Sequence, residues 1–358
     1  MTGYDYGNAR LRAMKSRLLT GADYQSLAAA GTLDHLLTQL LHTAYEESIE
    51  ATLGRGDELE AINAALSHHV AVTFRKVRRF FEAPELNLIA ALLQRYDVHN
   101  IKTILRGLEN KVSPGEIRAA QVPIGDLSEA ILAQLAKAPD PRTAIDLMAS
   151  MGLPLARPLV RLRSVHPNAE IPELELALDR WYFDQTIPLA RAAPGDSDRL
   201  EAALALEADL LNLLTLLRLV RTPAEQSDYL KHFRVDSVRG LFIGPGRLSF
   251  DTLEQATRQP SPEAAVKTLE ATPYGDPLAA GLEAYQRSKR LSTLERHLQR
   301  YRLHWRAGLI HSDPLGIGVL LGYMALKINE IGNLRWVAYG INIGLTPGGI
   351  IEDVESIL

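Results

Sequence analysis

The histidines are the first residues to consider for chemistry, because imidazole binds metals and transfers protons near neutral pH. The chain has ten, and the candidate metal ligands among them are His68, His69, His99, His297, His304 and His311. None forms an H-E-x-x-H motif, and no pair at i and i+4 is flanked by an acid, the spacing with which a helix holds zinc. The chain also lacks cysteine. We therefore expect no metal site and interpret these histidines as solvated or partly buried.

Two glycine-rich stretches could be taken for nucleotide-binding loops. The stretch at residues 240–246 is followed by Arg-Leu instead of Lys-Ser/Thr, and its proline removes an amide that a phosphate cradle would use. We therefore expect a turn there. The stretch Gly316-Ile-Gly318 follows Asp313-Pro and no predicted strand, which argues against a dinucleotide loop. Since no G-x-S-x-G motif occurs either, we expect no catalytic residue, no cofactor, no small-molecule substrate and no enzyme activity.

Basic residues interleave with aromatic residues in two stretches, residues 74–81 and 287–306. Such stretches can bind nucleic acid, but the net charge of −4 provides no overall field for it. We expect no nucleic-acid partner. Two interpretations stay open for these stretches: a solvated helix face, or a surface for an acidic protein partner or lipid headgroups.

Three asparagines recur in one setting: Asn100, Asn212 and Asn333. Each has an acid three residues earlier and apolar residues at +1, +4, +5 and +8, which is one face of a helix. The acids are Asp97, Asp209 and Glu330. An amide beside an apolar stripe must find a partner or cost about 1–3 kcal/mol. Either it bonds a neighbouring backbone or its own acid, or the three copies line a shared cavity around a common axis.

These helices belong to longer repeats. Arg95–Ile117 aligns without a gap on Ile328–Ile350 at an offset of 233, and residues 138–145 align on 259–266 at an offset of 121. Asp140 and Ser261 are predicted N-caps followed by proline, and Ser113-Pro-Gly-Glu is a predicted capping box. We predict a nearly all-α chain of three repeat units, at residues 1–135, 136–256 and 257–358.

The motifs together resemble a known family. The three acid-x-x-Asn helices, the opening Asn8-Ala-Arg-Leu-Arg12, the run from Arg95 to Lys102 and the segment from Asp313 to Trp336 are similar to the C subunits of the bacterial and archaeal V/A-type rotary ATPases. The d subunit of the eukaryotic vacuolar ATPase looks like a longer relative. The resemblance covers essentially the whole chain, and the order and spacing of the motifs make it specific.

The resemblance implies an all-α, pseudo-threefold, funnel-shaped socket. It implies a place on the cytoplasmic face of the plasma membrane, peripheral and held there by contact with the membrane proteolipid ring. The cavity of such a socket receives the foot of the central stalk, formed by the D and F subunits, so that torque passes between stalk and ring of a proton-translocating ATPase or ATP synthase. Such a socket binds no nucleotide and performs no chemistry.

On this basis we predict a set of residues that line the cavity or contact a partner. They are Asn100, Arg106, Asn212, Arg218, Glu330, Asn333, Arg335 and Trp336. The copies are not identical: an arginine stands at Asn+6 in the first two, whereas the third has Tyr339 there and an arginine at +2. We therefore do not expect the three units to meet their partners identically.

Two other classes of protein compete with this interpretation. A helical-repeat scaffold of the solenoid kind could bind a different protein partner, but its repeats run roughly 20–50 residues, and the unit here is at least about twice that. A helical enzyme using a central cavity has no acid cluster or metal-ligand spacing to support it. The longest apolar run, Leu315–Leu326, is shorter than the roughly 20 residues of a bilayer span, so we expect a soluble chain.

Overall fold

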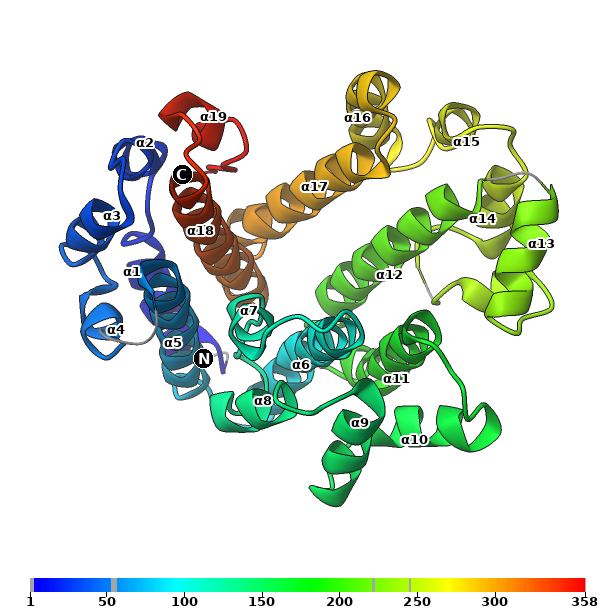
Figure 1. Cartoon of the computed structure of the whole chain (residues 1–358), viewed down its shortest axis with the longest axis horizontal. Coiled ribbons are helices and arrows are strands. Elements are labelled where there is room, and N and C mark those ends of the chain that lie inside the picture. The colour runs from blue at the N-terminus through cyan, green and yellow to red at the C-terminus, as the bar shows by residue number, and fades with distance from the viewer. Residues whose placement is uncertain (1–2, 53–56, 221–222, 245, 358) are drawn as a thin grey trace. The chain divides into compact units, whose positions relative to one another are not determined.

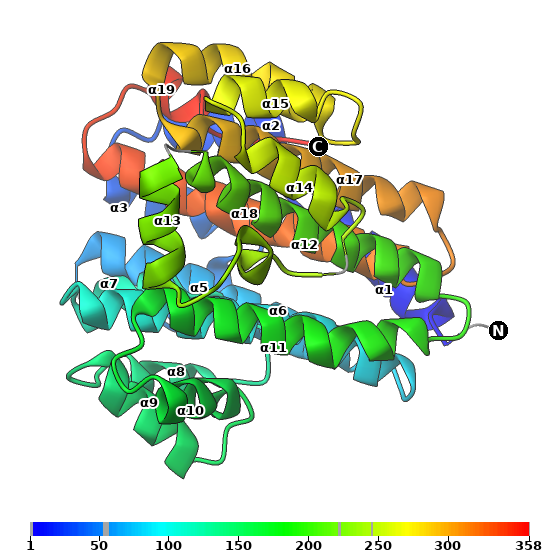
Figure 2. The same ribbon diagram turned by 90° about the vertical axis from the view of Figure 1, so that its right-hand side faces the viewer.

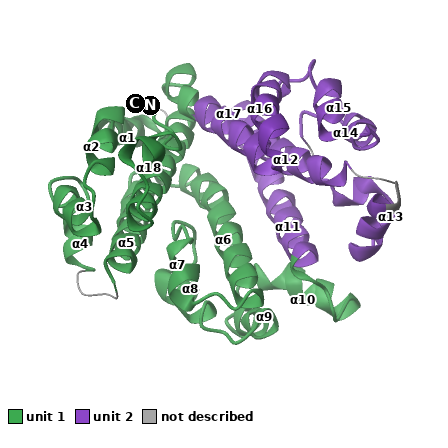
Figure 3. Ribbon diagram, turned by 45° about the horizontal axis from the view of Figure 1, so that its top comes forward, with its two compact units in different colours: residues 1–171, 307–358 green, residues 172–306 purple. Residues whose placement is uncertain are grey.

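The computed structural model describes residues 3–52, 57–220, 223–244 and 246–357, and every regular element in these ranges is a helix (Figure 1). The prediction of an all-α chain is confirmed. The chain divides into two compact units, coloured in Figure 3. The first comprises Met1–Ile171 and Ala307–Leu358, and the second comprises Pro172–Arg306. The predicted three-unit division and the funnel shape stay predictions.

The first unit joins both ends of the chain. Its helices are α1 (Asp5–Lys15), α2 (Gly21–Ala28), α3 (Leu33–Leu40), α4 (Glu46–Glu50), α5 (Glu58–Arg78), α6 (Glu85–Glu109), α7 (Pro114–Ala119), α8 (Glu129–Leu135), α9 (Pro141–Ser150), α10 (Ala156–Val165), α18 (Gly318–Asn342) and α19 (Pro347–Ile351). The long C-terminal helix α18 packs against α5 and α1, and α19 packs against α2 (Figures 1 and 2). Helices α8, α9 and α10 form a layer beside α6 (Figure 2).

The second unit contains α11 (Ile171–Arg191), α12 (Ser197–Leu219), α13 (Pro223–His232), the 3-10 helix η1 (Val238–Leu241), α14 (Phe250–Thr257), α15 (Pro262–Thr268), α16 (Gly275–Ser288) and most of α17 (Leu291–Ser312). Its core is built around α12, where Leu213, Leu216 and Leu217 are almost fully buried together with Leu253 and Leu278. Helix α12 is stable because it buries these leucines against the neighbouring helices.

The predicted helix starts are present. The Ser113 side chain accepts from the Glu116 N–H and the Glu116 carboxylate accepts from the Ser113 N–H, which is the capping box. Asp140 and Ser261 cap α9 and α15, each with proline at the first helical positions. The glycine-rich stretch at 240–246, expected as a turn, completes η1 and continues as loop, apart from residue 245, which lies outside the described residues.

Candidate functional site

Each repeated asparagine holds a loop that follows it in the chain. Asn212 donates from Nδ2 to the Ile243 carbonyl at 2.6 Å and accepts from the Ile243 N–H at 2.7 Å. Asn100 makes the same pair of bonds with Val122, at 2.8 and 2.7 Å. One hydrogen bond donated and one accepted, both with the same residue, fix the loop in position and orientation. We call this arrangement the asparagine clamp.

The third clamp joins Asn333 to the chain's C-terminal segment. Its Nδ2 donates to the Glu355 carbonyl at 2.9 Å, and the Glu355 N–H donates to Oδ1 at 3.2 Å. All three asparagines are buried, at 0%, 1% and 5% exposure. Of the twelve apolar residues predicted to share their helix faces, all but the partly buried Ile341 are buried. These observations favour the structural role of the asparagines, and contact with a partner stays a prediction.

The acid three residues before each asparagine binds a second point of the chain. Asp97 accepts from the N–H groups of Asp126 and Leu127 at 2.7 and 3.1 Å, immediately before Ser128 caps α8. Burial of the carboxyl raises the pKa of Asp97 to about 6, and the two N–H donors oppose that rise. A glycine, Gly125, passes close to this carboxylate, where a Cβ would overlap it.

Asp209 repeats this geometry in the second unit. It accepts from the N–H groups of Arg247 and Leu248, just before Ser249 caps α14. It also accepts from the Tyr274 hydroxyl at 2.7 Å. Burial raises the pKa of Asp209 as well. Gly246 holds the place of Gly125, and a Cβ there would also overlap the carboxylate.

Glu330 closes the third copy with the opposite end of the chain. Its carboxylate accepts from the Leu19 N–H at 2.6 Å, just before Thr20 caps α2, and from the Tyr45 hydroxyl at 2.6 Å. Lys327 adds an ion pair at 2.6 Å, with both side chains at most 4% exposed. Burial lowers the pKa of Lys327. The N-terminal segment therefore supplies what a downstream loop supplies in the other two copies.

His69 completes this buried cluster. Its ring lies 4.2 Å from the Tyr45 ring between centroids, and the Lys327 ammonium lies 4.6 Å from the same Tyr45 ring. Burial and then the nearby Lys327 lower the pKa of His69 to about 3, so the imidazole is neutral at physiological pH. The cluster is a packed network in which the Tyr45 hydroxyl is held as a donor to Glu330.

The other predicted contact residues divide into two groups. Arg335 donates to Ser67 Oγ and to the Gln121 carbonyl, both at 2.8 Å, and Trp336 donates to the Ile350 carbonyl at 3.0 Å. These two hold parts of the first unit together. Arg106 and Arg218 are exposed on their helices, although neither side chain is without an interaction. Exposure leaves these two as the members of the predicted set most open to a partner.

Part of the second basic stretch is internal. Glu207, 4% exposed, receives Arg302 at 3.0 Å and Arg306 at 3.0 Å. The interpretation of residues 287–306 as a solvated face is therefore too simple for these arginines, because they neutralise a buried carboxylate. Sequence reasoning missed Glu207 and Lys327, because a single charged residue in an apolar helix does not indicate which residue it pairs with.

Comparison with known proteins shows the family of the chain. Residues 7–352 match the family described as ATP synthase (C/AC39) subunit. The chain belongs to this family. It is 27% identical to the C subunit of the A-type ATP synthase of Haloferax volcanii over 351 residues, which cover 97% of this chain and 95% of that protein. It is 30% identical to the protein of the same name from Methanosarcina acetivorans, over 95% of this chain and 89% of that protein.

The match confirms the resemblance to the C subunits of V/A-type ATPases, and two of the motifs that carried it meet in space. Asn8, which is buried, donates to the Gly316 carbonyl at 3.0 Å, and Arg12 donates to the Pro314 carbonyl at 2.5 Å. The opening helix of this C/AC39-family chain therefore fixes the loop that leads into α18. In the described part of the chain, no three His, Cys, Asp or Glu side chains group as metal ligands, and no helix is long and apolar enough to span a bilayer.

Proposed function

We propose that this chain is the coupling subunit of a V/A-type proton-translocating ATPase or ATP synthase, a socket that joins the D and F subunits of the central stalk to the membrane proteolipid ring. In this role it transmits torque and has no active site of its own. It sits at the cytoplasmic face of the plasma membrane through protein contacts. The observation that carries the proposal is membership of the C/AC39 family over residues 7–352.

The internal geometry is compatible with this mechanical role. The long helices α6, α12 and α18 are each fixed twice, once by an asparagine clamp and once by the acid three residues earlier. These bonds lie in buried surroundings, where an intact hydrogen bond is costly to lose. A coupling needs elements that do not shift against their neighbours under load, and paired bonds of this kind provide that stiffness.

The first test is assembly. The tagged chain is mixed with purified D–F complex and with membranes that contain the proteolipid ring, and both are expected to be retained. A folded chain that retains neither would refute the coupling role and favour the alternative, a helical scaffold for a different partner. Turnover of any small molecule by the purified chain would refute the non-catalytic assignment.

The second test concerns the predicted contacts. The variants Arg106→Glu and Arg218→Glu reverse the two exposed predicted contact charges, and we expect them to weaken retention of the stalk or the ring at unchanged melting temperature. Arg157→Glu, an exposed reversal on α10, is the matched control. Equal retention by all three variants would remove these arginines from the interface.

A further inference from the structure

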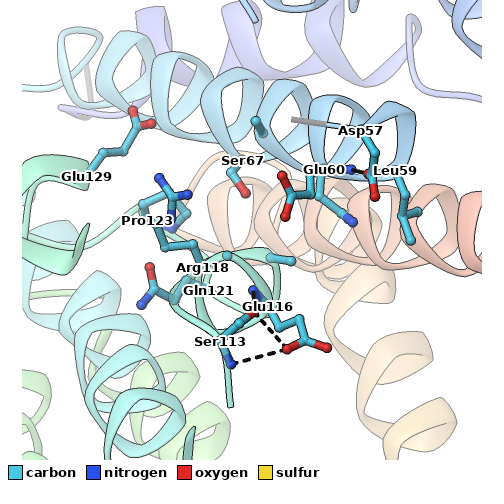
Figure 4. Close-up of a pocket in the computed structure, with 14 residues that line it drawn as sticks. Asp57, Leu59, Glu60, Ser67, Ser113, Glu116, Arg118, Gln121, Pro123 and Glu129 are labelled. Carbon is cyan, nitrogen blue, oxygen red and sulfur yellow. Dashed lines mark hydrogen bonds between the residues drawn. The ribbon is translucent and has the colours of Figure 1, made fainter. Parts of the chain in front are cut away.

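A cavity of about 720 Å³ opens in the first unit between the N-terminal half of α5 and the short helix α7. Figure 4 shows Glu60 and Ser67 on α5, across from Ser113 and Glu116 on the α7 side. Its size lies within the roughly 300–1,000 Å³ of ligand pockets. None of the three repeated asparagines or their acids lines it, whereas Ser67 and Gln121, which both accept from Arg335, do.

Acids outnumber bases around this cavity. Among the described residues that line it, Asp57, Glu60, Glu116 and Glu129 are acidic and Arg118 is basic. Helix capping accounts for Asp57, which accepts from the Glu60 N–H, and for Glu116, which accepts from Ser113. Capping leaves the negative charge in place and does not involve the Glu60 carboxylate, whereas Glu129 lies 3.7 Å from His68 Nδ1. The surplus charge favours a cation as the ligand.

Glu60 is held close to α7. Its Oε1 would lie 3.0 Å from a Cβ on Gly115, a separation tighter than ordinary side-chain contacts. The absence of a side chain at Gly115 therefore leaves this carboxylate room on the α7 side. Glu60 and Glu116 stand on opposite walls of the cavity, Glu60 on α5 and Glu116 on α7.

A buried hydrogen-bond donor on the cavity wall needs an acceptor from the ligand. Gln121 is 4% exposed and lines the cavity, and its Nε2 has no acceptor among the described residues. The carbonyl of the same residue accepts from Arg335 at 2.8 Å, so the backbone here is fixed. An unpaired buried donor costs about 1–3 kcal/mol, and a ligand that brings a carbonyl oxygen removes that cost.

We propose that this cavity binds a basic, extended peptide segment of a partner protein. A lysine or arginine side chain lies between Glu60 and Glu116, and a backbone carbonyl of the same segment accepts from Gln121 Nε2. A peptide supplies a cation and a carbonyl a few ångströms apart. A polyamine has no carbonyl, and phosphate groups of lipid or nucleic acid are repelled by the acids. Binding of such a peptide rests on the cavity alone, whereas the source of the segment within the complex rests on the proposed function.

The test uses the isolated full chain and a fluorescein-labelled, end-capped peptide of alternating lysine and alanine, followed by fluorescence anisotropy. We expect saturable binding that E60Q/E116Q weakens at least tenfold. Glutamine at 116 still completes a capping box, and melting temperature verifies the fold. A single-charge surface control, Glu283→Gln in the second unit, is expected to change Kd less than twofold.

The carbonyl contact is tested separately. Gln121→Leu removes the donor at similar volume and is expected to weaken the peptide three- to tenfold, while leaving the binding of spermidine unchanged. The proposal is overturned if spermidine competes as strongly as the lysine peptide, or if a peptide of alternating glutamate and alanine binds as tightly as the lysine peptide. It is also overturned if E60Q/E116Q binds the lysine peptide as tightly as the Glu283→Gln control does.

The source of the segment is tested in the assembled complex. A photo-crosslinking amino acid replaces Ala64, which lines the cavity, and mass spectrometry identifies the attached peptide. A lysine- or arginine-rich segment of another protein of the complex, lost in the E60Q/E116Q background, supports the proposal. A crosslink to lipid, to an acidic segment or to the same chain, or no crosslink in the intact complex, refutes it. Retention of the D–F complex is measured in parallel, so failure here is distinguishable from failure of the coupling role.

Discussion

Replacing Asn212 by alanine tests the asparagine clamp in the core of the second unit. The substitution removes both bonds to Ile243, at 2.6 and 2.7 Å, and Ile243 is itself only 5% exposed. A carbonyl and an N–H are left without partners inside the second unit. Each costs about 1–3 kcal/mol, so we expect Asn212→Ala to lower the free energy of unfolding by about 2–6 kcal/mol.

Asn212→Asp provides the matched variant. At neutral pH its carboxylate faces the Ile243 carbonyl without a donor, so burial and repulsion raise its pKa above the unfolded value of about 3.9. The folded state then binds more protons than the unfolded state. Its stability deficit therefore grows as pH rises above about 4 and shrinks at low pH, where the protonated acid donates as the amide does.

The assay is urea unfolding in a Trp336→Phe background. The remaining tryptophans, Trp181 and Trp305, both lie in the second unit and report on it alone. Asn110→Ala, which removes an exposed bond to the Arg106 carbonyl in the first unit, is the control and is expected to leave this transition unchanged. The structural role of the clamp is refuted if Asn212→Ala unfolds within 0.5 kcal/mol of the background, a limit of about the size of an ordinary surface substitution. A folded, equally stable Asn212→Ala that no longer retains the stalk would assign the residue to the cavity instead.

Two further predictions concern the acids. Because the pKa of Asp97 is raised to about 6, this group should lower the free energy of unfolding as pH rises from about 4 to about 6. The loss amounts to about 2–3 kcal/mol at 1.36 kcal/mol per pH unit. In urea titrations, Asp97→Asn should remove this part of the dependence of unfolding free energy on pH, and an unchanged dependence would refute the assignment. For the buried pair, Lys327→Met leaves Glu330 without its cation and should cost about 3–5 kcal/mol. Lys327→Met with Glu330→Gln should recover part of that loss, because the glutamine oxygen accepts from the Leu19 N–H and its NH2 group donates to the Tyr45 hydroxyl oxygen. A double variant less stable than Lys327→Met would contradict this reasoning.

Local features of the fold followed from the sequence because their causes are local. The apolar spacing around Asn212 determined both the helix and its buried face, and serine or aspartate before proline determined where α9 and α15 begin. The acid three residues before each asparagine was also predicted as part of the repeat. The pattern did not indicate the hydrogen-bond partners of the asparagine or of the acid.

The groups that these side chains bond are mostly backbone groups, which any residue supplies, so no residue type marks them. The residue bonded by Asn100 lies 22 positions later in the chain, and the residue bonded by Asn212 lies 31 positions later. The separation therefore differs between the copies. One signal was present in the sequence. The offset of 229 that aligns Tyr45 with Tyr274 also aligns Leu19 with Leu248, and Thr20 with Ser249. Extended backwards from Tyr45, this alignment gives Leu19 the place of Leu248. Once the structure shows that Leu248 donates to Asp209, the alignment assigns Leu19 to the acid of the third copy, Glu330.

That junction sets an order of events during synthesis. Leu19 leaves the ribosome 311 residues before Glu330, its partner, is made. At 5–20 residues per second the wait is about 15–60 s. The first two clamps can close as their own loops emerge, whereas the third stays open until the chain is nearly finished. Deletion of Leu19 with the residues before it leaves the Glu330 carboxylate without this donor. Deletion of Glu330 with the residues after it leaves the Leu19 N–H without its acceptor, so deletions at opposite ends of the chain break the same contact.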